Sequence, residues 1–169
     1  MAGLEYTTGS AHVYTLTVAT DHTFFVAAAQ VQVLVHNIGP CPPYSNRYPG
    51  DWKPAPRLTL TSRDGAWYVT DPLGRSTRAS GLYQFIVTTD HKVFLTPDSS
   101  PSGHADLARG EDLNYAGELR FTSSRNNRGQ LTEWSNRSGH YRPDPSYNYL
   151  ATDAIPELLS VPFHAVKNP

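Results

Sequence analysis

Hydrophobic and polar residues alternate over much of this chain, which is the period of a β-strand with one buried face. In the N-terminal part the alternation covers residues 13–18 and again 31–35, with a polar turn at residues 20–22 between them. We therefore predict strands in both segments. Because single strands are not stable alone, each needs a partner.

Residues 38–57 interrupt this pattern. They contain six prolines together with Gly, Ser and Asn. Proline removes a backbone donor and cannot propagate a helix or a β-ladder. The composition predicts an extended linker, residues 38–57, that separates residues 1–37 from a domain at residues 58–169.

Beyond residue 57 the chain shows three predicted hairpins. Each has two short alternating segments around a polar turn, and Gly65 in the first turn can take a positive φ. The strand pairs are residues 58–62 with 66–70, 83–88 with 92–95, and 116–123 with 130–135. Helix is expected only at residues 105–108 and in a short C-terminal segment, 145–159, that Pro156 interrupts. The pattern predicts a β-dominated α+β fold: a small antiparallel sheet or partly open barrel of about six strands.

Composition narrows the possible functions. The net charge is −1, but residues after Asn37 hold fourteen basic against thirteen acidic residues, a net charge of +1. The single cysteine, Cys41, excludes an internal disulfide framework and a Cys-based zinc site, including that of zinc nucleobase deaminases. No apolar run is long enough for a bilayer span, so we expect no membrane partner. No metal site is predicted.

Two Ser-Gly-His triplets carry the candidate chemistry, at residues 102–104 and 138–140. Two histidines brought together can act as general base and general acid, and a nearby Arg can neutralise a phosphorane. This equipment suffices for RNA cleavage by the RNA's own 2′-hydroxyl without metal or cofactor. We predict catalytic roles for His104 and His140 as the pair, Arg142 as the phosphate clamp, Glu118 as an orienting or basic carboxylate, and Tyr141 as a base-stacking ring. The alternative is that the second triplet only begins a rigid structural corner.

The segment from Arg120 to Arg142 is rich in arginine and holds one acidic residue, Glu133. Guanidinium groups interleaved with aromatic rings suit a phosphodiester backbone. The predicted nucleic-acid contacts are Arg120, Arg125, Arg128, Trp134 and Arg137. The alternative is that these residues form the solvated face of a hairpin.

Residues 1–37, which we call the leader, carry a different chemistry. His36 and Asn37 directly follow the alternating segment 31–35, and His22 lies fourteen residues before His36. An Asn after His can cleave its own peptide bond through a succinimide, with the His ring moving protons. Together with the preceding β-pattern, these residues resemble the last two blocks of a Hint (intein-like) self-processing domain, which implies autoprocessing roles for His22, His36 and Asn37. Ile38 follows where a splicing intein has Cys, Ser or Thr, so the resemblance implies cleavage without ligation. Without the first half of such a domain we do not expect this segment to process itself.

A Hint remnant, a proline-rich joint and a compact C-terminal module together resemble the layout of Rhs-type polymorphic toxins. The resemblance implies that residues 1–37 are the C-terminal remnant of the Hint domain and that the module is a toxin effector released after Asn37. It also implies secretion as part of a larger bacterial protein, an upstream delivery protein, action in a target cell, and a cognate immunity protein. The target is not implied, because effectors are exchanged behind the same Hint end.

Residues 102–143 are similar in order to a segment of plant IQ-motif calmodulin-binding proteins. The shared elements are Gly103-His104, Ala116-Gly117-Glu118 and the run Ser138-Gly139-His140-Tyr141-Arg142-Pro143. The chain lacks an IQ helix, so calmodulin binding is not expected. The shared order suggests that both histidine clusters belong to one pocket.

Two other functions remain open at this point. One is ADP-ribosyl transfer, in which Glu118 polarises the NAD ribose and Tyr115 or Tyr141 stacks on nicotinamide. The other is a binding module without enzymatic activity, in which the Ser-Gly-His corners are architectural. Cleavage of RNA is the leading hypothesis.

Overall fold

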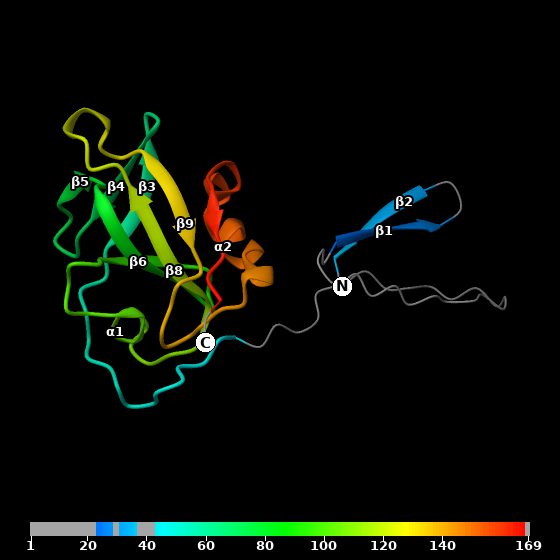
Figure 1. Ribbon diagram of the computed structural model, residues 1–169, viewed down its shortest axis with the longest axis horizontal. Coiled ribbons are helices and arrows are strands. Elements are labelled where there is room, and N and C mark those ends of the chain that lie inside the picture. The colour runs from blue at the N-terminus through cyan, green and yellow to red at the C-terminus, as the bar shows by residue number, and fades with distance from the viewer. Residues whose placement is uncertain (1–22, 29–30, 37–42, 168–169) are drawn as a thin grey trace. The chain divides into compact units, whose positions relative to one another are not determined.

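The computed structural model describes residues 23–28, 31–36 and 43–167, and the chain divides into two compact units, Met1–Pro40 and Cys41–Pro169 (Figure 1). In the first unit, β1 (Thr23–Ala28) and β2 (Val31–His36) form an antiparallel hairpin, with Phe24 opposite Val35. The predicted strand at residues 31–35 is confirmed. The predicted strand at 13–18 and the turn at 20–22 lie outside the described residues.

The second unit is built on a five-stranded sheet of order β10-β9-β8-β6-β7. Its strands are β6 (Gly81–Thr88), β7 (Val93–Pro97), β8 (Leu113–Phe121), β9 (Leu131–Ser135) and β10 (Phe163–His164). Neighbours are antiparallel except β10, which is parallel to β9. The β6–β7 and β8–β9 pairs confirm two predicted hairpins. A two-residue strand such as β10 has too little pattern to be predicted.

The second unit also contains a three-stranded sheet of order β3-β4-β5, which is linked to the larger sheet by backbone hydrogen bonds. Its strands are β3 (Thr59–Arg63), β4 (Ala66–Thr70) and β5 (Ser76–Arg78), and β3–β4 is the remaining predicted hairpin. Leu58 pairs with Leu95 of β7, with two backbone hydrogen bonds of 2.9 Å. A second link joins β4 to the β8–β9 connection, where the Trp67 amide donates to the Gly129 carbonyl, 2.8 Å away. The two sheets thus curl toward each other without closing a barrel, and the β-dominated α+β prediction is confirmed.

Alternation along the strands builds two apolar layers. Tyr115 and Leu119 of β8 face a core that includes residues of α2 (Tyr149–Ala154) and of the 3-10 helix η3 (Pro156–Ser160). Ala116 faces the opposite side and packs with α1 (His104–Ala108). Figure 1 shows α1 and α2 on either side of the sheet. Both helical predictions are confirmed, including the interruption at Pro156. No helix within the described ranges is long and apolar enough to cross a bilayer.

The prediction of a linker at residues 38–57 is wrong for its described part, residues 43–57. Tyr44 forms a two-hydrogen-bond bridge with Leu113, at 2.7 and 2.9 Å, and the Arg47 amide donates to the His140 carbonyl over 3.0 Å. Arg57 Nε donates to the Leu107 carbonyl, 2.7 Å away, and Ala55 is buried. The prolines prevent a regular strand, but the amides between them still pair with the domain one at a time. This segment is therefore part of the module.

Candidate functional site

The site lies on the face of the five-stranded sheet that α1 covers only in part. Strand alternation turns Glu118 and Arg120 away from the core that holds Leu119. The register places Gln84, Glu118 and Ser135 opposite one another across β6, β8 and β9. Residues directly opposite on one face lie close enough to interact. Polar groups from three strands are thus gathered in a row beside α1.

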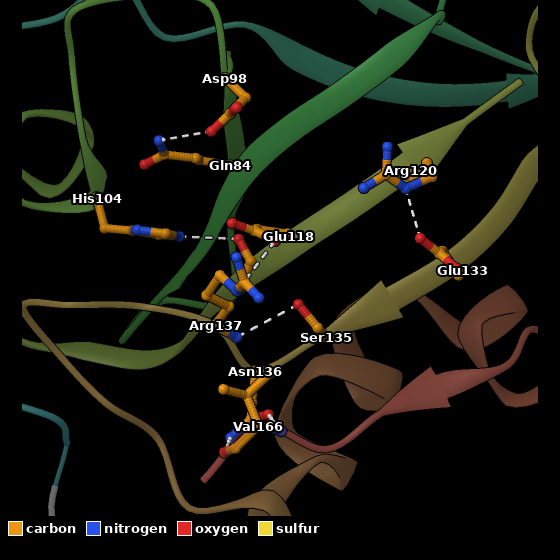
Figure 2. A network of polar contacts seen from close by, with 11 residues as sticks. Gln84, Asp98, His104, Glu118, Arg120, Glu133, Ser135, Asn136, Arg137 and Val166 are labelled. Atoms are coloured by element: carbon orange, nitrogen blue, oxygen red, sulfur yellow. Dashed lines mark hydrogen bonds and ion pairs between the residues drawn. The ribbon is translucent and has the colours of Figure 1, made fainter. Parts of the chain in front are cut away.

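Glu118 is the central carboxylate of this row. Its side chain is 16% exposed, and Arg137 Nε lies 3.9 Å from its Oε2 (Figure 2). Burial raises the pKa of Glu118, and the positive charge of Arg137 opposes that shift in part. A carboxylate with a raised pKa holds a proton more readily, which suits a general base.

His104 is the first residue of α1, and its ring points toward β8 (Figure 2). It is buried, and its Nε2 lies 2.8 Å from the Gly117 carbonyl oxygen, to which the neutral ring donates a hydrogen bond. Burial lowers the pKa of His104 to about 4, with smaller effects from the Gly117 hydrogen bond, His140 and Asp98. The predicted acid/base role of His104 is therefore not supported. The ring ties α1 to β8 beside Glu118.

Because His104 is neutral in the folded protein, we expect the free energy of unfolding to fall when the pH is lowered. The folded-state pKa of about 4 is below the ordinary value of 6.5, so the unfolded chain binds the proton more readily between these values. Stability from this group is complete above pH 6.5 and falls as the pH drops toward 4. We expect His104 to cost about 2 kcal/mol between pH 7.5 and pH 5.

Urea unfolding of the wild type and of His104→Gln at both pH values measures this effect. The variant should lose less stability on acidification, whatever its stability at neutral pH. His91→Asn, in the exposed β6–β7 turn, is the control and should follow the wild type. Identical pH dependence in all three proteins would contradict the assignment.

His140 lies across a hollow from this row. The hollow has a volume of about 290 Å³, and we call it the Glu118 hollow. Its lining residues are Gln84, Gly103, His104, Glu118, Arg137, Ser138, Gly139 and His140. The His140 side chain is 30% exposed, its Nε2 lies 3.9 Å from Asp51 Oδ2, and its ring meets Tyr48 edge-on at 5.4 Å between centroids. The two Ser-Gly-His corners thus meet at one hollow, and His140 is the one with a solvent-accessible ring.

Two aromatic residues predicted to contact a nucleic acid are buried in the core. Tyr141 is 2% exposed and its hydroxyl donates to the Glu111 carbonyl, 2.8 Å away. Trp134 is 2% exposed and packs on Phe163, with 4.4 Å between ring centroids. The predicted base-stacking role of Tyr141 and the predicted nucleic-acid contact of Trp134 are wrong, because both rings are buried in the core, where large apolar rings contribute to its stability.

The predicted arginines are divided by the structure. Arg137 lies beside Glu118, whereas Arg120 is paired with Glu133 on the same sheet face (Figure 2). Arg142 Nε donates to the Gly139 carbonyl over 3.0 Å, so it braces the loop that carries His140. Arg125 and Arg128 are exposed in the β8–β9 connection and do not line the Glu118 hollow. The cation beside Glu118 is therefore Arg137 and not Arg142, the residue predicted as the phosphate clamp.

Sequence reasoning missed three residues of this region. Gln84 had a usable signal, because it is a polar residue inside an otherwise apolar strand. Tyr48 and Asp51 had none, since they lie in the segment predicted as a linker. Among the predicted autoprocessing residues, His36 ends β2, while His22 and Asn37 lie outside the described residues.

Comparison of the chain with family models, curated proteins and solved structures found no match in any of the three. The chemistry available at the site is that of its own side chains. These are a carboxylate with a raised pKa, an accessible imidazole and a guanidinium around one hollow. Together they can take a proton, give a proton and stabilise an anion.

Proposed function

We propose that residues 41–169 form a metal-independent ribonuclease, with Glu118 as general base, His140 as general acid and Arg137 as the group that stabilises phosphorane charge. The observation that carries the proposal is that all three side chains line one hollow, where the Glu118 side chain is 16% exposed and the His140 side chain is 30% exposed. This differs from the His104–His140 pairing predicted from the sequence.

The reaction follows from these positions. Glu118 takes the proton of the 2′-hydroxyl as the 2′-oxygen bonds to phosphorus, and the bond from phosphorus to the 5′-oxygen breaks. His140 gives its proton to that leaving oxygen, and Arg137 neutralises charge on the non-bridging oxygens. The products are a 2′,3′-cyclic phosphate and a 5′-hydroxyl. Water can then open the cyclic phosphate with the acid and base roles exchanged.

The ADP-ribosyltransferase alternative receives less support from this geometry. Its two candidate stacking rings, Tyr115 and Tyr141, are both buried in the core, so neither lines the Glu118 hollow. The binding-module alternative gives no role to the raised pKa of Glu118 or to the accessible imidazole of His140, which lines the same hollow. The nuclease uses both features.

The proposed biological setting is that of a bacterial polymorphic toxin effector, secreted within a larger delivery protein and released by Hint-type cleavage after Asn37. The support is the His-Asn pattern of the leader together with the division of the chain into units at Pro40. In this setting RNA of the target cell is the substrate, and a cognate immunity protein protects the producing cell.

A cleavage assay with purified full-length chain tests the proposed activity. A labelled single-stranded RNA, incubated in EDTA without NAD, should yield 2′,3′-cyclic phosphate ends. We expect His140→Ala to lower the rate by about 10²- to 10⁴-fold, the usual contribution of a general acid. His91→Asn, a histidine in an exposed turn, should cleave like the wild type.

Two results would overturn the proposal. One is full activity of His140→Ala when the circular dichroism spectrum of the variant matches that of the wild type. The other is an RNA left intact by the wild type, and consumption of NAD in a parallel incubation that contains it would then favour the transferase.

A further inference from the structure

A second hollow adjoins the Glu118 hollow. It has a volume of about 400 Å³ and is lined by residues that include Asp51, Trp52, Lys53, Pro101 and Asp106; we call it the Trp52 hollow. Gly103 and His140 line both hollows, so the two meet at the proposed general acid. A substrate with its phosphate at His140 therefore has space for a neighbouring group on this side.

Trp52 is an aromatic side chain that is held in place yet remains exposed. A Cβ atom at Gly110 would lie 2.5 Å from its Nε1 and 2.8 Å from its Cδ1, so the indole sits directly against the glycine backbone. Gly110 has φ +76° and follows the end of α1. Even so, Trp52 is 37% exposed. An exposed, supported ring beside a reaction centre is suited to stacking on a planar ligand.

The segment around Trp52 is fixed to α1 by hydrogen bonds. Asp106 accepts from the Lys53 amide through Oδ1 and from the Gly103 amide through Oδ2, the latter over 2.7 Å. These bonds join the residue after Trp52 to the residue before His104. The wall of the Trp52 hollow is thus set in place before any ligand binds, which reduces the entropy lost on binding.

The Asp51 carboxylate supplies a hydrogen-bond acceptor in the Trp52 hollow. The Asp51 side chain is 83% exposed, and its Oδ2 lies 3.9 Å from His140 Nε2. A carboxylate there can accept hydrogen bonds from amino and imino groups of a base edge. Guanine presents two such donors side by side, whereas uracil presents one between two carbonyl oxygens.

We propose that the Trp52 hollow binds an unpaired RNA base next to the scissile phosphate, stacked on Trp52 and with its donor edge toward Asp51. The proposal rests on the nuclease assignment, because it supplies the base subsite of that active site. It makes single-stranded RNA the substrate class and favours guanine over uracil at this position. Base-paired RNA is excluded, because a paired base is stacked within its helix.

Binding to the full-length Glu118→Gln protein tests the subsite apart from catalysis. Fluorescence anisotropy with labelled single-stranded G-containing and U-only oligonucleotides gives the affinities. Adding Trp52→Ala should weaken binding of the G-containing oligonucleotide by about 5- to 150-fold, the range for loss of one stacked base. Trp52→Phe should retain most of the affinity. Leu73→Ala, at a side chain 79% exposed in the β4–β5 turn, is the control and should bind unchanged.

Further measurements separate this proposal from the nuclease itself. Asp51→Asn should reduce the preference for the G-containing oligonucleotide while leaving the U-only affinity unchanged. Without the Glu118 substitution, Trp52→Ala should raise KM more than it lowers kcat. Equal affinities for Trp52→Ala, Trp52→Phe and Leu73→Ala would overturn the subsite even where the wild type cleaves RNA. Trp52-dependent binding without cleavage by the wild type would overturn the nuclease and leave the subsite. No RNA binding would overturn both.

Discussion

Replacing Glu118 with Gln is expected to lower kcat for RNA cleavage by about 10²- to 10⁴-fold, the usual contribution of a general base. The amide has nearly the size of the carboxylate, so the row with Gln84 and Ser135 should be kept. What is lost is the ability to take the 2′-hydroxyl proton. Because the substitution removes chemistry and little packing, binding of RNA should change far less than kcat.

The pH dependence of kcat/KM gives this prediction a second readout. Burial raises the pKa of Glu118 above the ordinary carboxyl value, and the base works only when deprotonated. The rate should therefore rise with pH through a value above 4.5 and be lost as the pH falls below it. In Glu118→Gln this ascending limb should disappear.

Glu133→Gln is the matched control for Glu118→Gln. Glu133 lies on the same sheet face, is 37% exposed and pairs with Arg120. It does not line the Glu118 hollow, so its variant should keep the ascending limb and most of kcat. Comparable losses in the two variants would show that the sheet face needs negative charge in general and would contradict a base at Glu118.

Replacing Gly117 with Ala is expected to cost at least about 3 kcal/mol of unfolding free energy, at or above the upper end for overpacked sites. A Cβ there would lie 2.0 Å from the Ser135 carbonyl oxygen and 2.9 Å from Phe85 Cε1. The first contact is with backbone, so β8 and β9 would have to move apart. The same movement would displace the carbonyl that holds His104.

Urea unfolding of Gly117→Ala against Gly139→Ala measures this cost. Gly139 also lines the Glu118 hollow, but a Cβ there meets nothing within 4 Å. Its variant should stay within about 1 kcal/mol of the wild type. If both variants unfolded at the same urea concentration, the close approach of β8 and β9 at Gly117 would be contradicted.

The local elements could be predicted because their signals are contained in a few neighbouring residues. The β3–β4 hairpin is an example: Asp64 and Gly65 take φ values of +52° and +70°, as a two-residue turn between alternating strands requires. The C-terminal helical segment is another, since Pro156 cannot continue α2 and instead begins η3.

The candidate site was only partly predictable. Glu118 and His140 were predicted to belong to one catalytic site, but Arg137 was predicted only as a nucleic-acid contact, and its place beside Glu118 was not foreseen. His140 and Tyr141 are adjacent in sequence, yet one lines a hollow and the other is buried. Trp134 was likewise predicted to contact a nucleic acid, but it is buried. Exposure depends on what packs above each residue, which short-range pattern does not record.

By itself, the sequence determined the strands and turns of the three predicted hairpins, the two short helical segments and the residue types able to perform proton transfer, because each follows from spacing within one segment. Tertiary structure decided which of these side chains meet. Gln84, Glu118 and Ser135 share a row only through the register of β6, β8 and β9, and Trp52 lines a hollow with His140 only because proline-rich residues 43–57 pack on the module. Register and docking depend on apolar contacts between distant segments, such as Phe85 with Tyr115, so they exist only once the chain has packed.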